Sequence, residues 1–492
     1  MSLSRRVVLS GALGAAAATA AGASSASASN EDPFIYRPGT PTRTERRRAV
    51  VVGSGFGGGV AALRLGQAGV DTLVLERGQW WHSAPNRDTF SRLLTPDHRA
   101  GWFRTSPPIL ESPPVPLTPY AGVMERSALG DLDLICGAGV GGTSLVYHGA
   151  TWQPSEANFY RVMPGGIDFD EMNQVYYPRA SGVLGAKPIP DDVLDHKRYA
   201  TSKRFLELGR EIGMTERRMG VTTDWDVVRR ELRGELKPWV SEGEFAYGMN
   251  NGAKLSVDRT YIRLAQATGH VDVAALHVVT SVSKDAQGRW VTKANRITPY
   301  GVVVEKVVII SDALVLAAGS LNTSRLLLHA KHRGDLPDLP DTVGHDWGNN
   351  GDRVFSLVGV NEDQGTRMGG PVAGGVVDWD SGHPVTLESE PLPLPIESRT
   401  IAIFGMGIPD GHGRYYYSSA TGKVRLDWSD ANDLASRTAI RAKVAQLQKK
   451  VGGAIVDLNA ADRFVAHILG GAALGSVTDL HGRVHGHRGL YV

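Results

Sequence analysis

Cysteine is almost absent from this chain, because Cys136 is the single cysteine among 492 residues. One thiol excludes an internal disulfide framework and any zinc or iron–sulfur site built from several cysteines, and no metal site is expected. An excess of charge is also missing: 53 Lys and Arg stand against 51 Asp and Glu, a formal net charge of +2. A chain this close to neutrality lacks the basic surface of a nucleic-acid-binding protein, so no nucleic-acid partner is expected.

Long apolar runs are missing as well, apart from one near the start of the chain. No other stretch reaches the roughly 18 apolar residues that a membrane-spanning helix needs. Glycine, in contrast, is abundant: 59 of the 492 residues, a share well above the usual value of about 7%. So much glycine suits a backbone that approaches another group closely. The length allows two or three domains, and the composition is that of a globular protein.

Residues 1–28 have the pattern of a signal peptide for the twin-arginine (Tat) export machinery. Arg5 and Arg6 precede a run of small apolar residues, and Ala26-Ser27-Ala28 has the pattern of a cleavage site. The alternative, a membrane anchor, fits poorly with a run so rich in alanine and glycine. We therefore expect a secreted, extracellular protein that is exported with its cofactor already bound. Residues 29–44, which are polar and contain two prolines, are predicted to form a linker.

A dinucleotide-binding unit follows the linker. Residues 49–52 form a continuous apolar strand, residues 53–58 read G-S-G-F-G-G, a helix follows, and a second strand at 72–75 ends on Glu76. In such a unit the first glycine allows the tight turn, the second lets the backbone approach a pyrophosphate, and the last allows the helix to pack closely on the strand. The helix N-terminus favours phosphate, and the acid accepts hydrogen bonds from a ribose. The residues predicted to contact the cofactor here are Gly53, Gly55, Phe56, Gly57, Gly58 and Glu76.

Downstream segments favour FAD over NAD. A second glycine cluster lies at 136–145, a β-rich stretch with tight turns at 271–308, and a further strand–turn–helix at 313–330. A strand that rejoins the first sheet after such a meander is typical of the closing unit of a flavin domain. The predicted fold class is therefore α/β, or α+β overall, with a Rossmann-like FAD-binding domain.

Several segments together resemble the glucose–methanol–choline (GMC) oxidoreductases, and some are particular to their branch of bacterial FAD-dependent cholesterol oxidases. They include GSGFGGG, LVLERGQWW, GAGVGGTSLV, LAAGSLNTSRLLLHA, WGNNGD and HILGGAALG. The resemblance implies an FAD-binding domain assembled from discontinuous segments, and a β-sheet-and-helix substrate-binding domain that covers a steroid-sized cavity. The implied boundaries are 45–150 and 254–345 for the FAD-binding domain, 151–253 for helices and part of the substrate domain, 346–467 for the substrate-binding domain, and 468–492 for a return to the FAD-binding domain.

The resemblance also implies two catalytic residues. Oxidation of a secondary alcohol needs a base for the hydroxyl proton and a group that holds the oxygen. Glu397, in the stretch L-P-L-P-I-E-S, matches the glutamate that the family places over the steroid A-ring, and His467 matches the histidine beside flavin N5. Without the resemblance, Glu397 reads as a solvated loop acid and His467 as a core histidine. Further flavin contacts implied by the resemblance are Gly139, Gly142, Thr143, Tyr147, His148, Val279 and Ala318.

The chain also departs from the family pattern. Tyr147 stands where the family has an asparagine near the flavin, His148 where it has a glycine, and Ile468 where a proline follows the histidine. We expect altered packing around the flavin, with covalent attachment of FAD to His148 as the alternative. The family continues past G-L-Y-V with D-G-S-x-x-P and N-P-F, whereas this sequence stops at Val492. The expectation is therefore that the C-terminal family segment is missing and that activity is impaired.

The function implied by the resemblance is the FAD-dependent oxidation of a 3β-hydroxysteroid to the 3-ketone. O2 accepts the electrons and becomes H2O2, and a Δ5 to Δ4 isomerisation follows. The expected partners are the sterol, O2, the Tat machinery and, transiently, a membrane surface from which sterol is extracted. Two alternatives remain: another GMC alcohol oxidase or dehydrogenase with a different bulky substrate, and a catalytically impaired remnant that only binds flavin or steroid.

Overall fold

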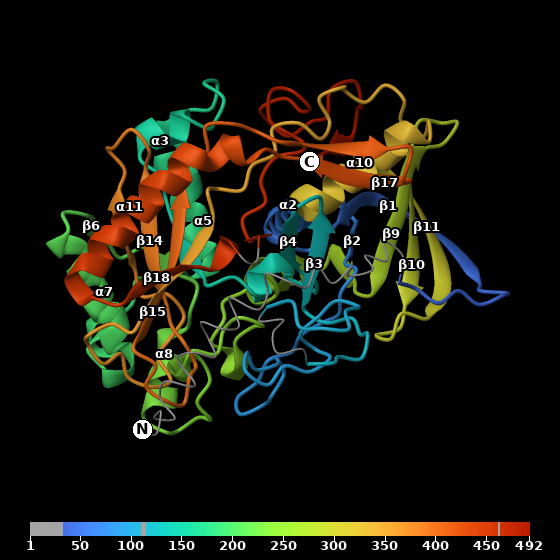
Figure 1. Ribbon diagram of the computed structural model, residues 1–492. Helices are drawn as coiled ribbons and strands as arrows, with labels where there is room; N and C mark the ends of the chain where they lie inside the picture. Colours follow the sequence, from blue (N-terminus) through green and yellow to red (C-terminus); the bar gives the residue numbers. More distant parts are fainter. Residues whose placement is uncertain (1–32, 110–114, 461–462) are drawn as a thin grey trace.

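The computed structural model describes residues 33–109, 115–460 and 463–492 of the chain. Two large β-sheets lie side by side, one containing β1, β9, β10 and β11 and the other containing β14, β15 and β18, with β3 and β4 between them (Figure 1). The predicted signal peptide at 1–28 lies outside the described residues. Within the described residues, no helix is both long enough and apolar enough to span a bilayer.

The first sheet carries the predicted dinucleotide unit. Its strand order is β8-β2-β1-β11-β10-β9, and β20 also pairs with β11. The neighbours from β8 to β11 run parallel, as does β20, whereas β10 and β9 are antiparallel. The continuous apolar run at 49–52 is fully buried, as expected for a strand with parallel neighbours on both sides. The elements are β1 (Thr42–Val52), α2 (Phe56–Gln67), β2 (Thr72–Leu75), β8 (Val271–Ala274), β9 (His277–Lys284), β10 (Trp290–Ile297), β11 (Val303–Leu316), α10 (Gly319–His332) and β20 (Leu490–Tyr491).

The second sheet is antiparallel throughout, with the order β18-β12-β15-β14-β13-β6. Helices α7 and α11 contact this sheet, and the buried residues of α11 share one hydrophobic cluster with Val385 and Leu387 of β14. Because side chains alternate along a strand, Glu388 and Glu390 lie on the opposite face. The elements are α7 (Ala200–Glu211), β6 (Thr215–Arg217), β12 (Arg353–Val358), β13 (Gly375–Asp378), β14 (Val385–Glu390), β15 (Thr400–Gly407), α11 (Leu434–Val451) and β18 (Ala454–Asp457).

Smaller elements join the two sheets. Strands β3 (Met124–Leu129), β4 (Leu132–Gly137) and β19 (Phe464–Val465) form a three-stranded sheet, and β5 (Ala150–Thr151) pairs with β7 (Gly220–Val221). A hairpin of β16 (Arg414–Ser418) and β17 (Lys423–Asp427) contacts α10. The remaining α-helices are α3 (Glu156–Tyr160), α4 (Phe169–Glu171), α5 (Tyr177–Leu184), α6 (Asp191–Leu194), α8 (Trp225–Leu232) and α9 (Arg263–Gln266). The π-helical and 3₁₀ segments are η2 (Gly142–Leu145), η3 (Met172–Tyr176), η4 (Lys197–Tyr199), η5 (Val240–Glu242), η6 (Asn250–Gly252), η7 (Asp258–Ile262), η8 (Asp430–Asp433) and η9 (Leu458–Ala460).

Segments near both ends of the described chain form β-pairs with other parts of the protein. The stretch 29–44 is more than a linker over its described part, since Ile35 bridges to Val302 and β1 begins at Thr42. At the other end, β20 adds to the first sheet through Leu490 and Tyr491, which pair with Leu314 and Val315. The last residues of the chain therefore add a strand to the first sheet.

Candidate active site

The glycine loop between β1 and α2 is held by backbone contacts that admit no side chain at two positions. Gly53 has a φ of +97°, and a Cβ atom there would lie 2.3 Å from the carbonyl oxygen of Ala317. At Gly58 a Cβ atom would lie 2.0 Å from the carbonyl oxygen of Gly53. These two glycines are therefore required by the turn and by the packing of α2 on the sheet.

Gly55 is different, because its surroundings are open. An added Cβ atom would meet only the Cα of Gly142, at an ordinary 3.7 Å. Gly55 is also the N-cap of α2, no side chain caps that helix end, and the first turn holds no acid. The first N–H groups of a twelve-residue helix thus lack a protein side chain and favour an anion. This cradle fits the pyrophosphate of a dinucleotide.

The second glycine cluster packs directly against the first. Gly142 has a φ of +57°, and a Cβ atom there would lie 2.7 Å from the Cα of Gly55. Gly139 approaches Trp81 so closely that a Cβ atom would lie 2.6 Å from the indole, and the Thr143 hydroxyl accepts a hydrogen bond from the Gly137 N–H at 3.0 Å. Ser54 links the two glycine clusters, because its Oγ accepts a hydrogen bond from the Gly141 N–H at 3.1 Å. The structure therefore brings together two segments that are 87 residues apart in sequence.

Glu76 lies at the end of β2, next to this cradle. Its carboxylate accepts hydrogen bonds from the Ser54 hydroxyl at 2.7 Å, the Ser54 N–H at 3.2 Å and the Gly78 N–H at 2.9 Å. A carboxylate has room for about four such bonds, so Glu76 can also accept from a ribose. The uncapped N-terminus of α2 and the open surroundings of Gly55 fit the pyrophosphate of FAD, and the carboxylate of Glu76 fits its ribose.

Gly57, Ala318 and Phe56 lie around the same cradle. Gly57 faces the Cβ of Ala317 at 3.8 Å, and the neighbouring Ala318 is the N-cap of α10. Phe56 contacts Tyr147 edge to face, with ring centroids 5.3 Å apart. Val279 lies on β9, partly buried against the hydrophobic cluster that includes residues of β1 and β2.

Tyr147 is surrounded by groups that the sequence did not indicate. Its hydroxyl is 2.6 Å from Oγ1 of Thr222, and Lys254 donates to its carbonyl oxygen while the ammonium lies 3.8 Å from its ring centroid. Burial raises the pKa of Tyr147 to about 12 and lowers the pKa of Lys254 well below its usual value. Tyr147 is therefore a neutral, packed ring at ordinary pH.

His467 is fixed by a buried acid. Its Nδ1 atom is 2.8 Å from Oδ1 of Asp352, and Oδ2 of Asp352 accepts from the N–H groups of Ala466 and His467 at 3.0 and 2.8 Å. The Asp352 side chain is 2% exposed, whereas the imidazole of His467 is 44% exposed. Although burial favours the neutral ring, Asp352 raises the pKa of His467. Because Nδ1 is engaged by Asp352 and the imidazole is partly exposed, Nε2 is the nitrogen that remains for another group.

Two carboxylates from β14 share the environment of His467. Glu388 is 3% exposed and accepts a hydrogen bond from the indole of Trp152. Burial, followed by the charge of Glu390, raises the pKa of Glu388 to about 7, and His148, Trp152 and His467 offset part of this rise. Phe404 pairs with Glu388 across β14 and β15, and its ring meets His467 edge to face at 5.5 Å. A buried acid that titrates near neutrality is suited to proton transfer.

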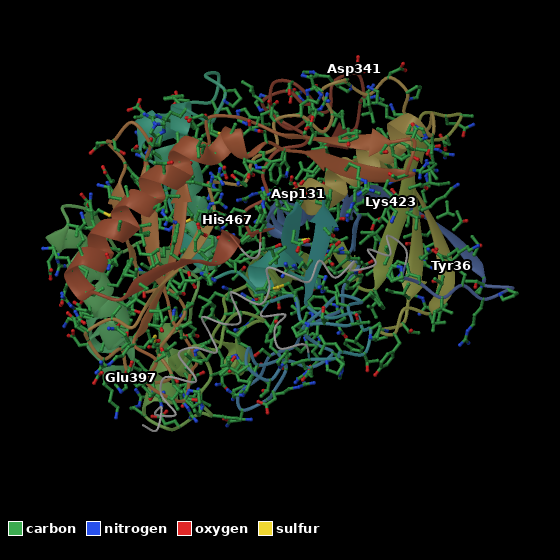
Figure 2. The ribbon with its side chains drawn as sticks, in the orientation of Figure 1. Tyr36, Asp131, Asp341, Glu397, Lys423 and His467 are labelled. Atoms are coloured by element: carbon green, nitrogen blue, oxygen red, sulfur yellow. The ribbon has the colours of Figure 1, made fainter. Side chains whose placement is uncertain are left out.

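Glu397 does not join this cluster. It lies on the loop between β14 and β15, where its carboxylate accepts hydrogen bonds from the N–H groups of Gly365 and Arg399. Figure 2 shows Glu397 well away from His467. The structure therefore brings His467 together with Glu388 and Glu390, and not with Glu397.

Three residues of the site were not chosen from the sequence. The alternation V-T-L-E-S-E at 385–390 is typical of a strand and would have placed both acids on one face. Asp352 ends the quoted segment WGNNGD, but nothing in the sequence indicates that it reaches His467, 115 residues away.

Comparisons with known proteins agree with the resemblance. Residues 351–457 match the family model described as GMC oxidoreductase, C-terminal. A cholesterol oxidase of Mycobacterium tuberculosis is 25% identical over 312 residues, which are 60% of this chain and 50% of that protein. A cholesterol oxidase of Acinetobacter baumannii is 22% identical over 364 residues, which are 68% of this chain and 59% of that protein. The chain thus spans between half and three-fifths of the length of these two relatives.

The fold is also that of a solved oxidase. The crystal structure of pyridoxine 4-oxidase from Mesorbium loti has a TM-score of 0.56 to this chain at 14% identity, covering 90% of this chain and 93% of that one. The fold prediction is confirmed, and so is FAD as the cofactor, because GMC oxidoreductases are FAD-dependent. The expectation that the C-terminal family segment is missing is wrong, since residues 351–457 match the family's C-terminal model.

Proposed function

We propose that this chain, a member of the GMC oxidoreductase family, oxidises the 3β-hydroxyl of a sterol to the 3-ketone and isomerises the Δ5 double bond to Δ4. O2 is the proposed electron acceptor and H2O2 the product. The observation that carries the proposal is the carboxylate of Glu388, buried beside His467 and with a pKa of about 7. The two relatives named cholesterol oxidase support the choice of substrate class.

FAD supplies the hydride acceptor when it is bound. The residues that would hold it are those of the glycine cradle, with Gly53, Gly55, Gly58 and Gly142 allowing the close approach and Glu76 accepting from the ribose. No side chain caps the N-terminus of α2, so its first N–H groups would be available to the pyrophosphate.

His467 would orient the alcohol. Because Asp352 holds Nδ1, the free Nε2 is the atom that accepts the hydroxyl proton or donates to the oxygen. The positive charge that develops on the ring is stabilised by the buried Asp352 carboxylate, as the raised pKa of His467 indicates.

Glu388 would carry the proton of the isomerisation, in place of Glu397. Conversion of a Δ5-3-ketone to the Δ4-3-ketone removes a proton from C4 and returns one to C6, so one group must first accept and then donate. An acid with a pKa of about 7 does both with little free-energy cost at neutral pH. The hydrogen bond from Trp152 and the antiparallel neighbours of β14 hold the carboxylate in place.

A comparison of two glutamate-to-glutamine variants tests the assignment of the proton carrier to Glu388. We expect Glu388→Gln to slow the isomerisation of a supplied Δ5-3-ketosteroid by about 10²-fold or more, the usual contribution of a positioned proton carrier. Glu397→Gln, a matched change on the loop between β14 and β15, should leave the rate unchanged. The rate is followed by the absorption of the conjugated ketone. Equal isomerisation in Glu388→Gln and the unsubstituted protein would remove Glu388 from the mechanism.

An activity assay with cholesterol distinguishes this proposal from two other functions. A GMC enzyme for another bulky alcohol would hold FAD but would not be reduced by cholesterol. An impaired remnant would hold FAD and respond to no alcohol. We further propose transient contact with a membrane surface as the route by which sterol reaches the site, and this contact would appear as faster turnover on cholesterol-containing vesicles than on dispersed cholesterol.

A further inference from the structure

His148 contributes a second imidazole to the cluster around Glu388. It follows η2 and precedes β5, and its Nδ1 atom is 3.1 Å from Oε1 of Glu390. Side-chain nitrogen and oxygen atoms of His148, Glu388 and Glu390 lie within 4.8 Å of one another. A charge on any one of these groups is therefore felt by the other two.

The two imidazoles contact the same aromatic ring. Phe404 meets His148 at a centroid distance of 6.3 Å and His467 at 5.5 Å, edge to face in both cases. Phe245 closes the other side of His148 at 4.8 Å. Each imidazole also has a carboxylate at Nδ1: Asp352 for His467 and Glu390 for His148. The site thus holds two histidine–carboxylate pairs, of which the proposed reaction uses one.

We propose that His148, held by Glu390, is a positioning residue for Glu388: its imidazolium keeps the Glu388 carboxylate ionised so that it can accept a proton from the substrate. This inference rests on the proposed function, in which Glu388 carries the proton.

The charges that surround these groups set the direction of the effect. Glu388 is faced by Glu390 on its own strand, by His148 and by His467, and His148 is faced by Glu390, Glu388 and Lys254. Burial opposes the charge on His148, but the attraction of Glu390 raises its pKa above the usual value. The imidazolium in turn lowers the pKa of Glu388, against burial and against the repulsion of Glu390.

Removal of the imidazolium should therefore leave Glu388 protonated at neutral pH. In His148→Asn the charge of Glu390 remains beside Glu388 without a counter-ion, and we expect the titration of Glu388 to move upward by about one pH unit. In the double variant His148→Asn/Glu390→Gln both charges are gone, so the midpoint should return most of the way. A merely structural role for His148 would not be reversed by a second change. His148→Gln serves as an alternative single variant if His148→Asn does not fold.

Infrared titration of the holoenzyme gives the first readout. The absorption of the protonated carboxylic acid is followed against pH, and the band absent from Glu388→Gln identifies Glu388. The matched control is His383→Asn, because His383 forms an exposed pair with Asp410 at 3.9 Å. We expect an upward shift in His148→Asn, its reversal in the double variant, and no shift in the control.

The pH profile for isomerisation of a Δ5-3-ketosteroid gives the second readout, because this step needs no change in flavin oxidation state. The rising limb of this profile should move upward with the infrared midpoint in His148→Asn. The rate should fall about fivefold at neutral pH and about tenfold well below the midpoint, as expected for a shift of one pH unit. If the infrared midpoint shifts while no variant isomerises the ketone, the proposed function fails and the role of His148 stands. If isomerisation proceeds and the midpoint does not move, or if the double variant does not reverse the shift, the role of His148 is overturned.

Discussion

Glu388 is a carboxylic acid with almost no contact with water, since only 3% of the residue is exposed. Its neighbours do not fully compensate for the lost hydration, because Glu390 repels its charge while His148, Trp152 and His467 attract it or donate to it. The balance leaves a pKa of about 7. Catalytic carboxylates often have such a raised pKa, and the buried charge then lowers the stability of the folded protein at higher pH.

This balance predicts a pH-dependent difference in stability. The folded protein binds the Glu388 proton more tightly than the unfolded chain, whose glutamate has its ordinary value of 4.5. The stabilising contribution is therefore complete below about pH 4.5 and is lost as the pH rises through about 7. Relative to the unsubstituted protein, Glu388→Gln should gain about 3 kcal/mol in unfolding free energy between these limits.

Urea unfolding at about pH 4.5 and about pH 8 measures the gain. Glu397→Gln is the matched control, with a carboxylate that lies in a surface loop and bonds to backbone N–H groups. Its difference from the unsubstituted protein should be the same at both pH values. A Glu388→Gln difference that does not grow with pH would mean that Glu388 is ionised freely in the folded protein.

At the scale of elements, the strand–glycine–helix unit was readable because its requirements are local. Gly53 adopts a positive φ, Gly58 packs on the carbonyl oxygen of Gly53 five residues earlier, and the burial of the 49–52 strand follows from its own composition. The carboxylates of the site could not be predicted from local sequence in the same way. The family match drew attention to Glu397, whereas the alternation along β14 places Glu388 and Glu390 on the inner face.

The pairing of Asp352 with His467 could not be predicted from either segment. Asp352 immediately precedes β12, and His467 follows β19, which joins a different sheet. Only the packing of the two sheets brings them to 2.8 Å. Pairs of this kind depend on tertiary structure and leave no periodic signal in sequence.

The open surroundings of Gly55 give a prediction for the glycine loop. Gly55→Val should fold, since an added Cβ atom meets the protein only at an ordinary 3.7 Å, yet its side chain would fill the space needed by the pyrophosphate. We expect a stable protein whose apparent Kd for FAD is at least about tenfold higher and which is purified with less flavin, because the phosphate contact is blocked. Flavin content is measured by absorption and folding by circular dichroism.

Gly182→Val is the matched control for this experiment. Gly182 lies in α5, and no atom lies within 4 Å of the position of an added Cβ. Flavin content should be normal in this variant. Full flavin content in Gly55→Val would contradict the placement of the pyrophosphate at the N-terminus of α2.

At the scale of the whole molecule, the glycine cradle lies on the first sheet, and Glu388 and Glu390 lie on the second. The chain crosses between them several times, and residues after β19 return to the first sheet, where β20 pairs with β11 (Figure 1). The site is therefore complete only when both sheets are folded and packed. We propose that the chain is exported in the folded state through the Tat route, so that the site is complete before export.

The twin arginines give a prediction about that export. Tat transport depends on the arginine pair, so Arg5→Lys/Arg6→Lys should keep the protein inside the cell while preserving its charge. The test compares the flavoprotein in the medium and inside cells of a Tat-competent bacterial host. Unchanged export of the double-lysine protein would exclude the Tat route and leave the role of residues 1–28 open to another explanation.

The central claim is that the FAD of this chain takes a hydride from a sterol alcohol. It is tested most directly by mixing the purified flavoprotein with cholesterol in the absence of O2 and following the visible absorption of the flavin. We expect the flavin to bleach at a rate that rises with cholesterol concentration and to recover its colour, with release of H2O2, when O2 is admitted. A flavin that dithionite bleaches and that saturating cholesterol leaves oxidised would contradict the account.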